Sequence, residues 1–142
     1  MSTLSNAVTA SASALNAQRA RIEVAVSNLA NAESTRGPDG QPYRRREVVL
    51  AAAPVNAFEA ALGDAGTTGV QVVQVLEDQE PFRVRYEPSH PDANPEGYVS
   101  VPNVDVAEEM VDMLGAARAY QANLMAINVI RDTIQRALEL GR

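Results

Sequence analysis

The clearest pattern in the chain is a row of apolar residues, spaced alternately four and three positions apart, in its C-terminal third. Such a row is typical of an amphipathic helix that lies against a second long helix. It predicts a helix over 105–140, about 50 Å long at a rise of 1.5 Å per residue. Arg131 is the one interruption of the row, which comprises Val106, Met110, Met113, Ala117, Tyr120, Leu124, Ile127, Ile134 and Leu138.

The N-terminal segment repeats this spacing and predicts a second helix over 2–32. Its row comprises Leu4, Val8, Ser11, Leu15, Gln18, Ile22, Ala25 and Leu29. Because the two rows match, we expect the terminal helices to pair as a coiled coil. Beside the rows lie small residues, namely Ala7, Ala10, Ala14 and Ala17 on the first helix and Ala116, Ala119, Asn123 and Ala126 on the last. They either face other subunits or reflect only the helix propensity of alanine.

The middle of the chain alternates short strand-like runs with Pro- and Gly-rich turns. Strands are predicted over 43–50, 70–76 and 82–86, with the third paired to the second. The Ala- and Gly-rich stretch 51–69 is predicted to be a loop, with a short turn of helix at 57–62. The predicted fold is therefore mainly α with a small β-rich insert. Its three segments are the N-terminal helix 1–32, the insert 33–104 and the C-terminal helix 105–142.

Composition favours close helix packing over a thick globular core. The 142 residues are 46% hydrophobic but only 4% aromatic, and much of the apolar count is alanine. The net charge of −6 argues against nonspecific nucleic-acid binding. No apolar run is long enough for a membrane span, and the N-terminus lacks the pattern of a cleaved secretory signal. Alone, this predicts a cytoplasmic protein, unless export leaves the N-terminus intact.

Catalytic chemistry finds little support in the residues. The chain has no Cys and a single His, so no metal site and no cofactor are expected. His90 lies between Pro88 and Pro91, which favours a loop role over catalysis. Acidic residues at the start of the last helix, Glu108, Glu109 and Asp112, are explained by compensation of the helix dipole. The sequence therefore predicts that the protein is not an enzyme.

The basic run 44–46 has two interpretations. Such runs are mostly solvated residues at a strand edge, where they deter unwanted strand pairing. The alternative is contact with an acidic partner.

Four stretches of the sequence resemble the FlgC-type family of bacterial flagellar basal-body rod proteins. They are Ser27–Ala32, Gly37–Arg44, Val84–Pro88 and, most specifically, Gly97–Val99 followed by Pro102–Asp105, Glu109–Val111 and Tyr120–Asn123. The stretches occur in family order and span nearly the whole chain. Glu33 departs from the family pattern, in which Asn or Asp is common at this position.

The resemblance implies a structural subunit of the rod, the shaft that crosses the periplasm and transmits torque to the hook. It implies partners among other rod proteins, copies of the same chain and adjacent basal-body components such as the export gate, the MS-ring side and the rings. Export would follow the flagellar type III route without cleavage. The residues expected at assembly interfaces are Leu4, Val8, Leu15, Ile22, Asn28, Leu29, Asn31, Tyr98, Pro102, Asn103, Met110, Met113, Tyr120, Gln121, Asn123, Leu124 and Ile127.

Two other classes of function remain open at this point. A soluble coiled-coil adaptor or export chaperone would use the same helical seams to bind a helical client. A small hydrolase would depend on His90.

Overall fold

The computed structural model describes residues 2–55 and 67–140 of the chain. Its elements, in order, are α1 (Ser2–Ala30), β1 (Arg46–Pro54), β2 (Thr68–Glu77), β3 (Arg83–Tyr86), β4 (Tyr98–Val101) and α3 (Val106–Leu140). The strands form two separate two-stranded sheets, β1–β2 and β3–β4. The predicted fold class, mainly α with a small β insert, is confirmed.

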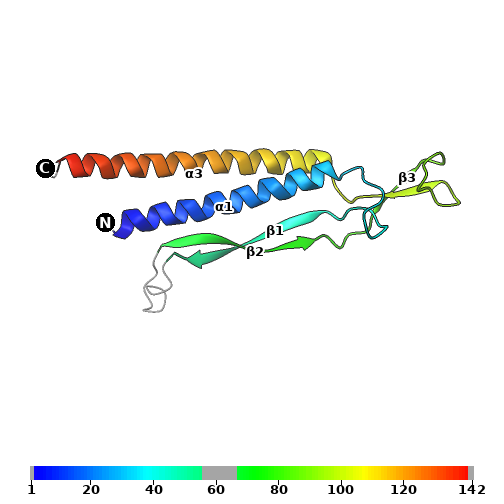
Figure 1. Cartoon of the computed structure of the whole chain (residues 1–142), viewed down its shortest axis with the longest axis horizontal. Coiled ribbons are helices and arrows are strands. Elements are labelled where there is room, and N and C mark those ends of the chain that lie inside the picture. Colours follow the sequence, from blue (N-terminus) through cyan, green and yellow to red (C-terminus); the bar gives the residue numbers. More distant parts are fainter. Residues whose placement is uncertain (1, 56–66, 141–142) are drawn as a thin grey trace.

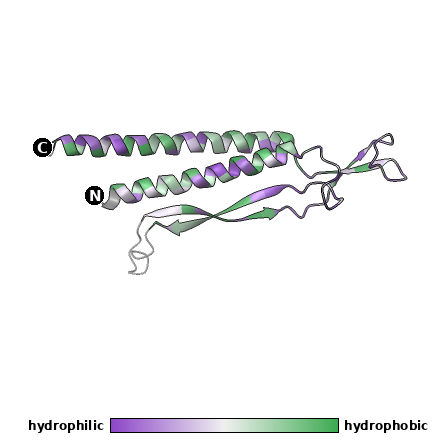
Figure 2. Ribbon diagram, viewed as in Figure 1, coloured by the Kyte–Doolittle hydropathy of each residue, from purple (hydrophilic) through white to green (hydrophobic). Residues whose placement is uncertain are grey.

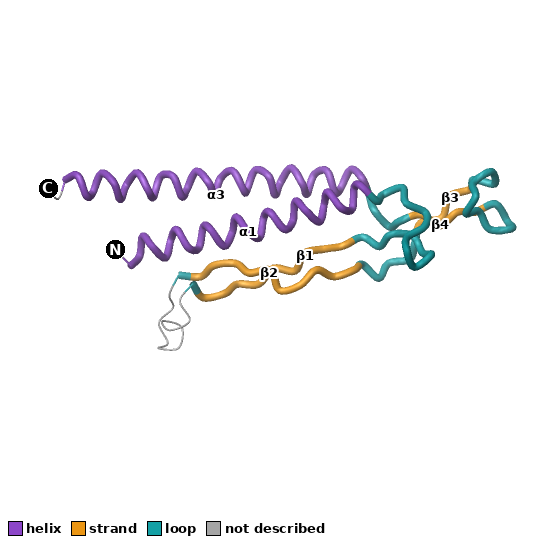
Figure 3. Tube along the Cα trace, in the orientation of Figure 1, coloured by secondary structure: helices purple, strands orange, loops and turns teal. Residues whose placement is uncertain are grey.

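The molecule is an elongated rod of three parallel layers (Figure 1). Helices α1 and α3 lie side by side and antiparallel, so both chain termini are at one end. The β1–β2 hairpin runs back along α1, and the β3–β4 hairpin extends beyond the other end of the helices. Loops at that end connect α1 to β1, β2 to β3 and β4 to α3 (Figure 3).

Small residues form most of the buried interior of the two helices. Ala17 and Ala25 of α1 and Ala116 of α3 are almost completely buried. Small side chains at these positions allow other segments to pack closely against the helices. The suggestion that the small-residue rows face other subunits is therefore wrong for Ala17 and Ala116. These two residues pack within the chain.

The inner face of α3 is rotated relative to the predicted row. Met113, Tyr120 and Ile127 are half-buried, as expected, but Met110 and Leu124 are 51% and 45% exposed. The second row of residues on the inner face is Glu109, Ala116 and Asn123, rather than the predicted Met110, Ala117 and Leu124. Glu109 and Ala116 are both buried. The pattern thus identified the helix and half of its inner face.

Strand β1 begins three residues later and ends four residues later than predicted, so the prediction was wrong for 43–45. It pairs with β2 in antiparallel register from Arg46↔Glu77 to Pro54↔Thr68. The register shifts between Val49 and Leu50. The predicted loop 51–69 was therefore wrong at both ends, since 51–54 and 68–69 are strand residues. The predicted helical turn at 57–62 lies outside the described residues.

One hydroxyl joins the β1–β2 hairpin to α1. The backbone N–H of Val70 donates to Ser13 Oγ at 3.0 Å, and Ser13 in turn donates to the carbonyl of Ala10 at 2.7 Å. The neighbouring Gly69 is buried, and a Cβ at this position would lie 2.7 Å from Ser13 Oγ. The hairpin therefore approaches the helix closely enough to require glycine here.

We expect Gly69→Ala to lower the free energy of unfolding by about 1–3 kcal/mol, because the added methyl displaces the Ser13 hydroxyl. In the Ser13→Ala background the same change should cost clearly less, since the clashing oxygen is gone. Urea unfolding of the four proteins of this cycle measures the coupling. Strictly additive effects would contradict the close approach.

The third predicted strand exists, but its predicted partner was wrong. β3 pairs with β4 rather than with β2, in the register Arg83↔Val101 to Tyr86↔Tyr98. Tyr86 and Tyr98 meet edge to face with ring centroids 5.2 Å apart. Gly97 immediately precedes β4 with φ of +86°, and a Cβ there would lie 2.9 Å from the Tyr86 ring. A glycine is needed for both reasons.

Candidate functional site

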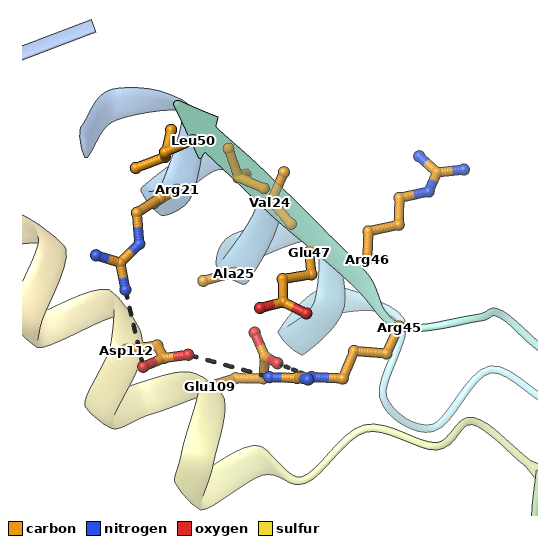
Figure 4. Close-up of a pocket in the computed structure, with 10 residues that line it drawn as sticks. Arg21, Val24, Ala25, Arg45, Arg46, Glu47, Leu50, Glu109 and Asp112 are labelled. Atoms are coloured by element: carbon orange, nitrogen blue, oxygen red, sulfur yellow. Dashed lines mark hydrogen bonds and ion pairs between the residues drawn. The ribbon is translucent and has the colours of Figure 1, made fainter. Parts of the chain in front are cut away.

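A buried polar cluster lies where α1 ends, α3 begins and the chain enters β1. Asn28, Arg45 and Glu109 form its centre, and Tyr43 and the backbone of Arg46 complete it; we refer to these five residues as the polar junction. Figure 4 shows Arg45 and Glu109 facing each other across the space between β1 and α3. The groove around them has a volume of about 240 Å³.

Asn28 is 1% exposed and satisfies its whole amide group within the junction. Its Nδ2 donates to the Arg46 carbonyl and to Glu109 Oε2, both at 2.9 Å. Its Oδ1 accepts from the Arg46 N–H at 3.0 Å and from the Tyr43 hydroxyl at 2.9 Å. One side chain of α1 therefore holds both the first residue of β1 and the first turn of α3.

The charge of Glu109, which is 2% exposed, is balanced by Arg45. Arg45 Nε donates to Glu109 Oε1 at 2.6 Å, and its side chain is 18% exposed. This hydrogen bond raises the pKa of the Arg45 guanidinium above its ordinary value, while burial acts in the opposite direction. Glu108 and Asp112 lie farther from Arg45, at 3.5 and 4.0 Å.

The sequence interpretation of these charged residues needs correction. Arg45 is not a solvated edge residue, because it forms the buried ion pair with Glu109. Compensation of the helix dipole does not by itself explain Glu109, which pairs with Arg45. Asp105 does cap α3, because it accepts from the N–H groups of Ala107 and Glu108. The signal for this contact was present in the sequence. The basic run 44–46 and the acidic start of α3 have opposite charges, which could have predicted that the two segments pack together.

Asn103 extends the junction toward the β3–β4 hairpin. Its Oδ1 accepts from the Arg45 N–H at 3.0 Å. Arg83 of β3 donates to the carbonyl of Val104 at 3.2 Å. On the other side of the hairpin, Asp92 accepts from Thr35 at 2.8 Å and pairs with Arg36 at 3.1 Å. Short polar contacts thus attach the projecting hairpin to the loops at the helix ends.

The residues expected at assembly interfaces fall into three groups. Asn28 and Pro102 are buried within the chain. Tyr98, Met110, Gln121 and Leu124 are exposed. The others are half-buried, namely Leu4, Val8, Leu15, Ile22, Leu29, Asn31, Asn103, Met113, Tyr120, Asn123 and Ile127. Several of them lie along the contact between α1 and α3, and the interface role of the set stays a prediction.

The face of α3 turned away from α1 carries large exposed apolar residues. Val111, Leu114, Met125 and Val129 are 68%, 55%, 62% and 64% exposed, and we call them the outer row. At 100° per residue they lie opposite Met113, Tyr120 and Ile127. Figure 2 shows hydrophobic residues along α3, mixed with hydrophilic ones toward its C-terminal end. A helix that is apolar on two opposite faces is typical of one that has partners on both.

The other chemical candidates are absent from the described part of the chain or have structural roles. There, no group of three or more His, Cys, Asp or Glu side chains could hold a metal ion. His90 lies in a turn, where its Nδ1 accepts from the Asp92 N–H at 3.0 Å. Among the described residues, no helix combines the length and apolar character of a membrane span.

Comparison with known proteins identifies the family. A family model described as flagella basal body rod protein matches residues 9–38, and one described as flagellar basal body rod FlgEFG protein C-terminal matches 96–140. Flagellar basal-body rod protein FlgC of Escherichia coli O157:H7 is 48% identical over 130 residues, which cover 92% of each chain. FlgC of Bacillus subtilis strain 168 is 44% identical over 142 residues, or 93% of this chain and 94% of the relative. FlgC of Borreliella burgdorferi is 37% identical over 147 residues. These relatives confirm the resemblance, and the chain belongs to the FlgC family of flagellar basal-body rod proteins.

Proposed function

We propose that this chain is a structural subunit of the flagellar rod that assembles through the outer row of α3 and transmits torque along its paired helices. The outer row carries this proposal. Four large apolar side chains, each more than half exposed, lie on one face of the helix, and apolar residues gathered on one face are typical of a contact surface. Repetition of such contacts by helical symmetry distributes a load over many weak interfaces.

The polar junction suits a subunit whose segments must not slide past one another under load. A torque-bearing subunit has to keep its helices and hairpins in fixed relative positions, and contacts that join three segments do this. Asn28 and Glu109 each bond to two other segments at 2.6–3.0 Å. Hydrogen bonds are directional, so a buried network of them fixes position more tightly than apolar contact alone. This role requires neither a cofactor nor catalysis.

The surroundings of the subunit follow from this proposal. Its neighbours in the assembly are other rod proteins and copies of itself, with further basal-body components at the ends of the rod. The rod crosses the periplasm, and the chain reaches it through the flagellar type III route with its N-terminus uncleaved. The parts of the helices far from the polar junction become fully ordered only on assembly, since less of their surface is covered within the chain.

We expect the double variant Val111→Glu/Val129→Glu to abolish swimming when it replaces the natural protein in a motile host. Burying two carboxylates in an apolar interface is costly, so the subunit should fail to enter the rod. The matched variant Val111→Ala/Val129→Ala keeps the face apolar and should swim nearly as well as the wild type. Soft-agar motility and purification of basal bodies measure the effect, and far-UV circular dichroism checks that both variants fold alike. Normal swimming of the glutamate variant would refute the proposed surface.

A further inference from the structure

A shallow groove next to the polar junction brings three arginines together. Three arginines, Arg36, Arg44 and Arg46, line it, and its volume is about 500 Å³. Two acidic residues, Asp39 and Glu77, also line it, and Asp39 accepts from the Gln41 N–H at 3.3 Å. We call it the arginine groove. It lies among the loops at the end of the helices that leads to the β3–β4 hairpin (Figure 3). Figure 4 shows that Arg46 points away from α3 and its acidic first turn, unlike Arg45.

Aromatic rings hold two of these guanidinium groups in place. The Cζ of Arg44 lies 4.4 Å from the centre of the Phe82 ring, and that of Arg46 lies 5.5 Å from the centre of the Tyr43 ring. A stacked guanidinium still presents its N–H groups at its edge. Because both side chains are already restrained, binding a ligand there loses less side-chain entropy.

The acidic residues of the chain leave much of this positive charge available. Among the described residues no carboxylate forms an ion pair with Arg44, which donates only to the carbonyls of Asp78 and Glu80 at 3.3 and 3.5 Å. Arg46 is 3.5 Å from Glu77, and both side chains are about half exposed. The Arg36 side chain is 68% exposed beside Asp92. Exposed pairs of this kind contribute little and exchange readily.

We propose that the arginine groove binds an acidic segment of a neighbouring protein other than a copy of this chain, with Arg44 and Arg46 each holding a carboxylate. Guanidinium groups pair with carboxylates through two parallel hydrogen bonds, so a fixed pair of them selects for spaced acidic residues. A nucleic acid fits less well, because the net charge of −6 repels a long polyanion. No residue of α3 lines the groove, so it does not overlap the outer row and the two surfaces can be occupied by different partners.

Fluorescence polarisation with a short labelled peptide of alternating Glu and Ser tests this inference at low salt. We expect the purified chain to bind this peptide, to ignore the same peptide with Gln in place of Glu, and to lose affinity as salt is added. Arg44→Gln should weaken binding about tenfold, as expected for one lost charge-assisted pair. Arg131→Gln removes an exposed charge on α3, far from the groove, and should have no effect.

Three outcomes would overturn the inference. Equal weakening by Arg44→Gln and Arg131→Gln would show that only overall charge matters. Tighter binding of single-stranded DNA or inorganic phosphate, with the same dependence on Arg44, would make this a phosphate site. Self-association that is lost in Arg44→Gln would make a second copy the occupant. If Arg44→Gln unfolds by circular dichroism, the double variant Arg36→Gln/Arg46→Gln provides the same test at two exposed positions.

Discussion

Glu109→Gln should lower the free energy of unfolding by about 3 kcal/mol, a large fraction of the stability of a small protein. The change removes the charge that balances Arg45, whose side chain is only 18% exposed and cannot be fully solvated by water. It also introduces an amide that cannot accept from both Arg45 and Asn28 in the same way as the carboxylate.

Glu108→Gln is the matched control, because Glu108 is adjacent, equally charged and 62% exposed. Its loss should change the free energy of unfolding by less than about 0.5 kcal/mol. Urea unfolding followed by circular dichroism compares the two variants with the wild type. Similar, small effects at both positions would mean that the ion pair does not stabilise the junction.

Asn28→Asp should lower the free energy of unfolding at neutral pH by about 3 kcal/mol or more, at least as much as Glu109→Gln does. The substitution is nearly isosteric, but it replaces the Nδ2 donor with an oxygen that faces Glu109 Oε2 and the Arg46 carbonyl at hydrogen-bonding distance. Two carboxylates so close cannot both be ionised without strong repulsion, so in the folded state the pair would retain a proton. The unfolded chain holds no such proton above pH 4–5.

The pH dependence of this variant has a definite sign. Folding binds a proton that unfolding releases, so the stability of Asn28→Asp relative to wild type falls as pH rises from about 4 to 7. Asn16→Asp on the exposed face of α1 is the control and should follow the wild type over this range. Thermal unfolding of the three proteins at several pH values is the measurement. A deficit that does not depend on pH would argue against direct contact between the residue at position 28 and Glu109.

The sequence predicts the helices well because their signal is local. Four-and-three spacing gave both long helices to within two residues of their ends, and Asp105 marked the start of α3. The inner face of α3 was harder to predict. Met110 is more apolar than Glu109, so a pattern of hydrophobicity places Met110 inside. Glu109 is buried only because Asn28 and Arg45, both distant in sequence, satisfy its carboxylate.

The pairing of strands was also harder to predict, because it too depends on residues that are distant in sequence. β3 follows β2 closely along the chain, which favoured a hairpin between them. The actual partner of β3 is the four-residue strand Tyr98–Val101, too short and too close to Pro102 to stand out. The Ala-rich end of β1 has low β propensity, and its strand conformation depends on pairing with β2 beside α1.

The central claim, that α3 contacts neighbouring subunits through its outer row in the rod, is tested most directly by a density map of intact basal bodies in which this chain is traced. We expect Val111, Leu114, Met125 and Val129 to be covered by other subunits, with α1, α3 and the polar junction arranged as here. A map in which the outer row faces open solvent, or in which α1 and α3 have separated, would contradict the claim.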